Sequence, residues 1–224
     1  WVPRADQEAW LAATRADGAP DFQVRPHGDT VAWIVVTFAE PRSRNAAIVG
    51  YDLSTKPPSA EAVLRARDTG DVAMTRGIRL VQEPAGQMAV MLSLPVYRND
   101  APTDTLEQRR DAFQGCVGIA VRLGDFMTAI LDEGEPGWKL RLYDGQIATK
   151  DCEIFAQEAS AASGEAMLEG TTAIEFAGQR WTLDVGIPAG RLQEGTPRVA
   201  SLILLIGLGF SALMTVLVWA LVTR

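Results

Sequence analysis

The chain has 224 residues, of which 47% are hydrophobic and 22% are charged, an ordinary composition for a folded protein with one or two cores. Its formal net charge is -7 and no run of basic residues interrupts the sequence, which argues against nucleic acid as a partner. One histidine and two cysteines exclude an HExxH metal site and a four-ligand zinc site, and no cofactor is expected.

The first part of the chain predicts two helices and two strands. Residues 6–18 have apolar side chains near helical spacing and end in glycine, which is typical of a helix. The runs "DFQVRP" and "VAWIVVTFAEP" have the composition of strands. A second helix should begin at Ser59, a good N-cap after two prolines, and end at Gly70, which suits a left-handed C′ position.

Strand patterns dominate the rest of the chain before the C-terminus. Residues 77–83 and 87–98 and the run "QGCVGIAVRLGDF" resemble strands, with a polar loop before the third. A short helix, "DFMTAIL", then precedes the predicted strands "WKLRLYDG", "TAIEFAG" and "QRWTLDVGIP". We therefore expect an α+β fold with antiparallel sheets, in which a helix-plus-sheet unit occurs twice.

The C-terminal segment 199–222 contains 24 residues without a charge. About 20 apolar residues suffice for a helix to cross a bilayer, so this segment is predicted to be a transmembrane helix. The sequence does not begin with methionine and shows no signal peptide, although the preceding domain would need export. We therefore expect the sequence to be a fragment of a longer chain.

Several of these runs together resemble the CHASE domain family. The matching stretches are "VLRARDTGDVAMTRGIRLVQE", "VMLSLPVYR" and "GCVGIAVRLGDFMTAIL", with the terminal apolar segment and the opening "WVPR". CHASE domains are extracytoplasmic sensory modules of histidine kinases and of diguanylate cyclases or phosphodiesterases. The resemblance implies a stalk helix, a distal and a proximal PAS-like unit and a descending membrane helix. The stalk helix and the first membrane helix would lie outside this sequence.

From the resemblance we expect a membrane-distal PAS-like unit at 1–123, a membrane-proximal one at 124–198 and a transmembrane helix at 199–222. The function it implies is ligand sensing by a homodimeric receptor in a bacterial inner membrane, with the sensory domain in the periplasm. A conformational change would pass through the membrane helix to a kinase or a cyclic-di-nucleotide enzyme. The alternative is a membrane-anchored PAS-like interaction module without a small ligand.

Catalysis is not expected within this sequence. No G-x-S-x-G motif follows a strand before the membrane segment. Asp52 and Glu83 could do acid–base chemistry as a pair, but nothing in the sequence brings them together.

The resemblance also implies a ligand site. Asp52 precedes the RARDTG helix by the same interval as the ligand-binding aspartate of cytokinin-binding members. The segment after RARDTG and the run "VMLSLPVYR" would line the pocket. The predicted ligand-binding residues are Asp52, Met74, Thr75, Ile78, Leu80, Gln82, Met91, Ser93 and Pro95. A threonine expected near Gln82 and Glu83 is missing, which argues against an adenine-type ligand.

Structural roles remain open for these and other polar residues. Asp52 could cap the turn into "STKPPS", contact a ligand, or do both. The arginines and the aspartate of RARDTG fit a helix face and its hydrogen bonds, and Tyr97 and Arg98 fit a strand end. His27 lies in a loop by composition. Cys116 and Cys152 could form a disulfide in an oxidising compartment or remain core thiols.

Overall fold

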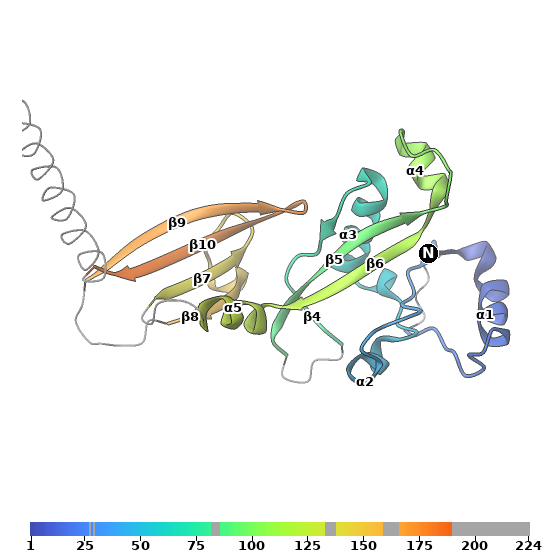
Figure 1. Ribbon diagram of the computed structural model, residues 1–224, viewed down its shortest axis with the longest axis horizontal. Helices are drawn as coiled ribbons and strands as arrows, with labels where there is room; N and C mark the ends of the chain where they lie inside the picture. Colours follow the sequence, from blue (N-terminus) through green and yellow to red (C-terminus); the bar gives the residue numbers. More distant parts are fainter. Residues whose placement is uncertain (27, 29, 82–85, 133–137, 159–165, 190–224) are drawn as a thin grey trace, which may run out of the picture. The chain divides into compact units, whose positions relative to one another are not determined.

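The computed structural model describes residues 1–26, 28, 30–81, 86–132, 138–158 and 166–189 (Figure 1). The chain forms two compact units. Unit 1 contains Trp1–Gly134, Arg141–Ala156 and Thr172–Leu183, and unit 2 contains Glu135–Leu140, Gln157–Thr171 and Asp184–Arg224. The predicted border after residue 123 stays a prediction.

The predicted membrane segment 199–222 lies outside the described residues. In the part of the chain that is described, no helix combines the length and the apolar character needed to cross a bilayer.

The N-terminal part of unit 1 is built mostly from helices and turns. Its elements are β1 (Val2–Pro3), η1 (Arg4–Asp6), α1 (Gln7–Ala16), β2 (Ala32–Trp33), α2 (Arg42–Asn45), η2 (Ala46–Ile48), η3 (Leu53–Thr55) and α3 (Pro57–Thr69). The predicted first helix is confirmed as α1. The helix predicted from Ser59 begins at Pro57, since proline at the first helical positions already has the required φ. It ends as expected at Gly70, which has a left-handed φ of 83°.

Two predicted strands are largely wrong. The run "VAWIVVTFAEP" forms the two-residue β2 and an isolated bridge from Val35 to Asp52, and "DFQVRP" makes a single bridge at Arg25. The physical reason is that the backbone here bonds to the segment around Asp52 instead of to a long strand. The Ile34 amide donates to the Asp52 carboxylate, and the Val36 amide donates to the Tyr51 carbonyl.

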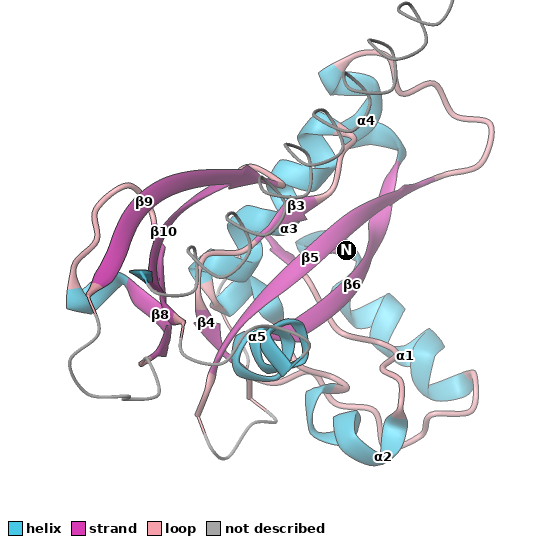
Figure 2. Ribbon diagram, turned by 60° about the vertical axis from the view of Figure 1, so that its left-hand side comes forward, coloured by secondary structure: helices cyan, strands magenta, loops and turns pink. Residues whose placement is uncertain are grey.

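The first sheet lies wholly in unit 1. Its strands are β3 (Ala73–Met74), β4 (Ile78–Arg79), β5 (Met88–Tyr97) and β6 (Phe113–Arg122). Antiparallel β6 pairs with β5 along its length, so β3 and β4 share the other edge of β5. Figures 1 and 2 show α3 running along this sheet, against β5.

A helix that the sequence interpretation missed lies between β5 and β6. The predicted polar loop contains α4 (Leu106–Ala112). A capping box starts this helix, since the Thr105 hydroxyl accepts from the Gln108 amide and the Gln108 side chain accepts from the Thr105 amide. The predicted helix after β6 is confirmed as α5 (Leu123–Asp132).

The second sheet has the strand order β8-β7-β10-β9. Its strands are β7 (Lys139–Asp144), β8 (Glu153–Gln157), β9 (Met167–Phe176) and β10 (Gln179–Pro188), with η4 (Lys150–Cys152) before β8. Three of them are predicted from the sequence, and β8 is not. The expected α+β class with antiparallel sheets is confirmed.

Side chains alternate across β5 and so separate two apolar clusters. Val90 faces a core formed with Met74, Leu123, Leu142 and Ile154, all in unit 1. On the other face, Met91 packs against a cluster formed by Ile34 and Phe113 with Val63 of α3.

Gly50 makes a tight contact that only glycine permits. Its φ is 82°, and an added Cβ would lie directly against the Gln23 carbonyl oxygen. We expect Gly50→Ala to lower the free energy of unfolding by about 2 kcal/mol or more, through left-handed strain and a backbone shift.

Gly18 is the matched control, because it has a φ of 88° but an added Cβ would meet nothing within 4 Å. Gly18→Ala should lower the free energy of unfolding by about 1 kcal/mol, through the left-handed strain alone. Urea unfolding of both variants measures the difference. Equal losses would contradict a role for the close approach at Gly50.

Candidate functional site

A groove of about 850 Å³ lies in unit 1. The segment 34–41 and the α2–η2 turns line it together with β6, and Met91 and Ser93 contribute from β5. Ligand pockets in proteins usually have volumes of about 300–1,000 Å³, so this groove has a suitable size for a small molecule.

Small residues of β6 leave room for the groove. Ser93 pairs with Gly118 and Met91 pairs with Ala120, and directly paired residues share one face of an antiparallel sheet. The β6 strand therefore places no large side chain beside Ser93. An added Cβ at Gly118 would meet its nearest neighbour, the Leu92 carbonyl oxygen, at 3.7 Å, so the position has room for a Cβ.

Asp52 supports the wall of this groove through hydrogen bonds. Its side chain is fully buried, and its Oδ1 accepts from the amides of Ile34 at 2.9 Å and Ser54 at 3.0 Å. The Ser54 hydroxyl donates to Oδ2 at 2.8 Å. Ile34 and Leu53 line the groove, whereas Asp52 is not among the lining residues. The capping role is confirmed, because Asp52 is the N-cap of η3. Ligand contact by Asp52 stays a prediction.

Ser93 contributes an unusual polar atom to the groove. The residue is only 1% exposed, yet its hydroxyl has no hydrogen-bond partner among the described residues. Buried hydroxyls are normally paired, because an unpaired one loses its hydration without compensation.

The structure divides the predicted ligand-binding residues into three groups. Leu80, Met91 and Ser93 line the groove. The residues that do not line it are Asp52, Met74, Thr75, Ile78 and Pro95. Gln82 lies outside the described residues.

The residues away from the groove have structural contacts. Met74 points into the core on the other face of the sheet. Thr75 is fully buried and supports β5, since its hydroxyl accepts from the Met91 amide at 2.9 Å. Ile78 pairs with Ala89 and Pro95 pairs with Cys116 in the sheet ladder.

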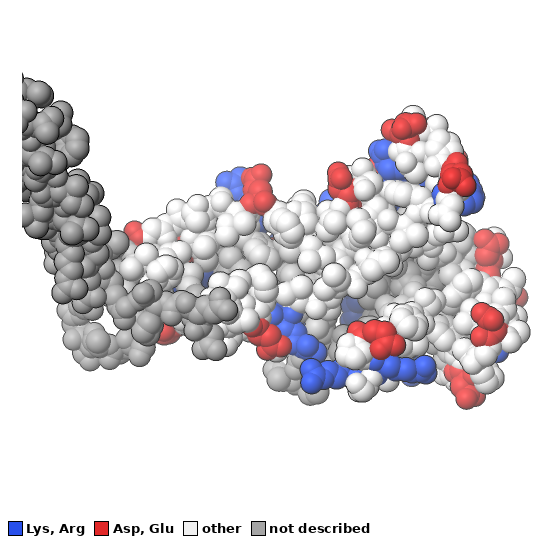
Figure 3. All heavy atoms as spheres, in the orientation of Figure 1, with Lys and Arg blue, Asp and Glu red and all other residues white. Residues whose placement is uncertain are grey.

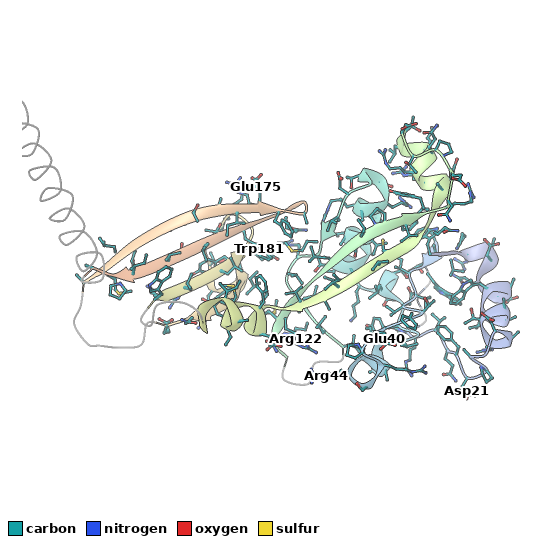
Figure 4. The ribbon with its side chains drawn as sticks, viewed as in Figure 1. Asp21, Glu40, Arg44, Arg122, Glu175 and Trp181 are labelled. Carbon is teal, nitrogen blue, oxygen red and sulfur yellow. The ribbon has the colours of Figure 1, made fainter. Side chains whose placement is uncertain are left out.

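Sequence interpretation missed the aromatic and charged residues of the groove. Trp10, Phe38 and Phe113 line it, as do the charged Glu40, Arg44 and Arg122. Figure 3 shows basic side chains gathered along the lower edge of the face shown, over β4 and α2, and Figure 4 labels the three charged residues. The one signal in the sequence for these groove residues is the apolar run "VAWIVVTF", in which apolar and polar side chains do not alternate.

Cys116 also lines the groove and is a free thiol, as is Cys152. Burial raises the pKa of the Cys116 thiol to about 11. The group is therefore neutral at physiological pH and is a poor nucleophile. Among the described residues, no group of His, Cys, Asp and Glu side chains could hold a metal ion.

The RARDTG motif connects the C-terminal end of α3 to α4 and β5. The Asp68 carboxylate accepts from Arg110 at 2.6 Å and from Arg67 at 2.7 Å, and the hydrogen bond from Arg110 holds the pKa of Asp68 far below its usual range. Tyr97 donates its phenolic hydroxyl to the Arg67 carbonyl at 2.6 Å. These contacts confirm the structural interpretation of the motif and of Tyr97. His27 lies outside the described residues.

A groove of this volume with mostly apolar walls and a few polar groups is typical of a small-molecule binding site. The family model of the CHASE domain matches residues 1–155, and the chain belongs to this family. CHASE domains are extracytoplasmic sensory modules of membrane receptors, including histidine kinases, and have no catalytic role themselves.

The chain is also similar to probable histidine kinase 4 of Oryza sativa subsp. japonica. The two are 34% identical over 100 residues, which are 43% of this chain and 10% of the rice protein. The chain thus spans about a tenth of the length of this relative.

Proposed function

We propose that this chain is the ligand-sensing module of a transmembrane receptor and that the groove beside β6 binds a small molecule. The observation that carries the proposal is the buried Ser93 hydroxyl, which has no hydrogen-bond partner among the described residues and lies in a groove of suitable volume. A ligand that hydrogen-bonds this group recovers the cost of its burial, about 1–3 kcal/mol. The finer features of the proposal are a bacterial inner membrane, a periplasmic sensory domain, a homodimer and a cytoplasmic kinase or cyclic-di-nucleotide enzyme.

Hydrogen bonds within unit 1 offer a route for the signal away from the groove. Met91 of the groove is bonded to Thr75, in both directions, at the end of β3. The neighbouring Met74 amide donates to the Ala177 carbonyl in the turn between β9 and β10, and Gln179 donates back to the Met74 carbonyl. A ligand that moves β5 would therefore move this turn, and β10 leads along the chain to 199–222. The ligand shifts the equilibrium only by its differential affinity for the two states.

A second function, protein interaction without a small ligand, has one observation in its favour. The face of β5 and β6 opposite to Ser93 exposes apolar side chains, with Leu94 49%, Val117 61% and Ile119 62% accessible. Exposed apolar patches often mark interaction sites.

Filling the groove tests the primary proposal. Gly118→Leu places a large side chain beside Ser93 and Met91, at a position with room for a Cβ. We expect the full 224-residue chain to be stabilised thermally by at least one compound of a metabolite library, and Gly118→Leu to abolish that shift while remaining folded by circular dichroism.

Gly170→Leu is the matched control, since Gly170 lies in β9 and an added Cβ there meets nothing within 4 Å. This variant should retain the full ligand-induced shift. A library without any stabilising compound, or equal shifts in the parent and Gly118→Leu, would favour the interaction module instead.

A further inference from the structure

We infer that the ligand of this groove is an amphipathic organic anion, with an apolar or aromatic body, a hydrogen-bonding group for Ser93 and a carboxylate at the Arg44 and Arg122 end. The inference rests on the proposed function of the groove and specifies the chemistry of its ligand.

The apolar body follows from the walls of the groove. The side chains of Trp10, Ile34, Met91 and Phe113 line it, and Ile34 and Phe113 belong to a buried cluster. A ligand without substantial apolar surface would gain little here, because transfer of apolar area from water is the main favourable contribution of such walls.

The hydrogen-bonding group follows from Ser93. Its hydroxyl is buried and has no partner within the described part of the chain, and Ser93 lines the groove together with Met91. A hydroxyl can both donate and accept, so a ligand carbonyl, hydroxyl or amine would satisfy it. A pure hydrocarbon would leave it unpaired.

The anionic group follows from the charges along the groove. Arg44 and Arg122 line it, and Glu40 is the one acidic side chain in its lining as described. The Glu40 carboxylate already accepts from the Arg42 amide at 3.0 Å, at the start of α2. Arg44 is exposed and forms no ion pair or hydrogen bond with its side chain among the described residues.

The exposed Arg44 guanidinium brings a positive charge to the groove, in contrast with the net charge of -7 of the whole chain. In an acidic protein such a site attracts anions that the rest of the surface repels. Guanidinium groups match the planar geometry of a carboxylate and bind it through two parallel hydrogen bonds.

Three probes that share one ring system test this inference on the full 224-residue chain. They are 1-naphthaleneacetate, 2-(1-naphthyl)ethanol and 2-(1-naphthyl)ethylamine, which carry a negative, zero and positive charge at neutral pH. Isothermal titration calorimetry should show the anion binding about tenfold more tightly than the alcohol, and the amine binding most weakly. This preference should shrink as salt is raised, because Arg44 is exposed.

The variants separate the charge from the rest of the groove. The double variant Arg44→Gln with Arg122→Gln should lose the preference for the anion and keep the affinity for the alcohol. Arg42→Gln is the matched control, because Arg42 is exposed on the same short helix but does not line the groove. Circular dichroism verifies that each variant is folded.

Equal affinities for the three probes overturn the inference, as does a preference for the anion that survives in the double variant. Failure of the anionic probe to bind also overturns it. The proposed function is judged separately by the metabolite library and Gly118→Leu, so a neutral compound that binds in the groove would refute the inference and leave that function standing.

Discussion

Asp52→Ala should lower the free energy of unfolding by about 3 kcal/mol. The Asp52 carboxylate is fully buried and is the acceptor for the Ile34 and Ser54 amides and for the Ser54 hydroxyl. Alanine leaves both amides without this acceptor in a closed site, and each buried unpaired donor costs about 1–3 kcal/mol. Denaturant unfolding measures the loss, and a loss below about 1 kcal/mol would contradict the structural role.

Asp52→Asn is the informative partner of this change. The amide oxygen still accepts from both backbone donors, and the amide nitrogen can donate to the Ser54 oxygen. The Ser54 hydroxyl is then free to donate to Thr30, whose oxygen lies 3.0 Å away. We therefore expect Asp52→Asn to cost about 1 kcal/mol or less and to retain ligand binding in the groove.

The same pair of variants tests whether the Asp52 carboxylate contacts a ligand. If the carboxylate itself binds a ligand, Asp52→Asn should remain stable yet lose ligand-induced stabilisation, since the charge is removed and the shape is kept. If the carboxylate only holds Ile34 and Ser54, ligand binding in Asp52→Asn should match the parent. Thermal shifts with a stabilising compound distinguish these outcomes.

The sequence pattern correctly predicts those helices and strands whose local signal is strong. Gly70 ends α3 because only glycine adopts its left-handed φ of 83° without strain, and β5 is a predominantly apolar run. The capping box at Thr105 is present in the sequence, but the polar composition around it predicts a loop. The apolar run after residue 30 predicts a longer strand than the one that forms. Its backbone amides donate hydrogen bonds to the segment around Asp52 instead, a tertiary contact that no local pattern reveals.

The groove was predictable only in part, for a similar reason. Met91 and Ser93 share a face of β5 through simple alternation, so the prediction for these two residues agrees with the groove. The same resemblance named Met74, which lies on the opposite side of the sheet in the core. Arg44 and Arg122 are separated by more than seventy positions, and they line one groove only because α2 and β6 both border it in the folded chain. Such a convergence depends on tertiary structure and leaves no spacing in the sequence.

Leu142→Ala tests whether the two predicted PAS-like units fold independently. Leu142 belongs to β7 of the second sheet, is 3% exposed and packs in one core with Met74 of β3, Val90 of β5 and Leu123. Deleting most of a buried leucine costs about 2–5 kcal/mol, through lost transfer free energy and the cavity that remains. Because the core is shared, we expect a loss of about 3 kcal/mol that destabilises β5 and β7 together.

Hydrogen exchange measured by mass spectrometry shows which elements lose stability. Amides of β5 and α3 should lose protection in Leu142→Ala by the same factor as amides of β7, since a shared core opens as one cooperative unit. Leu94→Ala is the control, because Leu94 lies on β5 and is 49% exposed, so protection should change little. If β5 and α3 keep the protection of the parent while β7 loses its own, residues 1–123 fold without the second sheet. A ligand in the groove could then reach that sheet through hydrogen bonds such as those of Met74 and not through a common core.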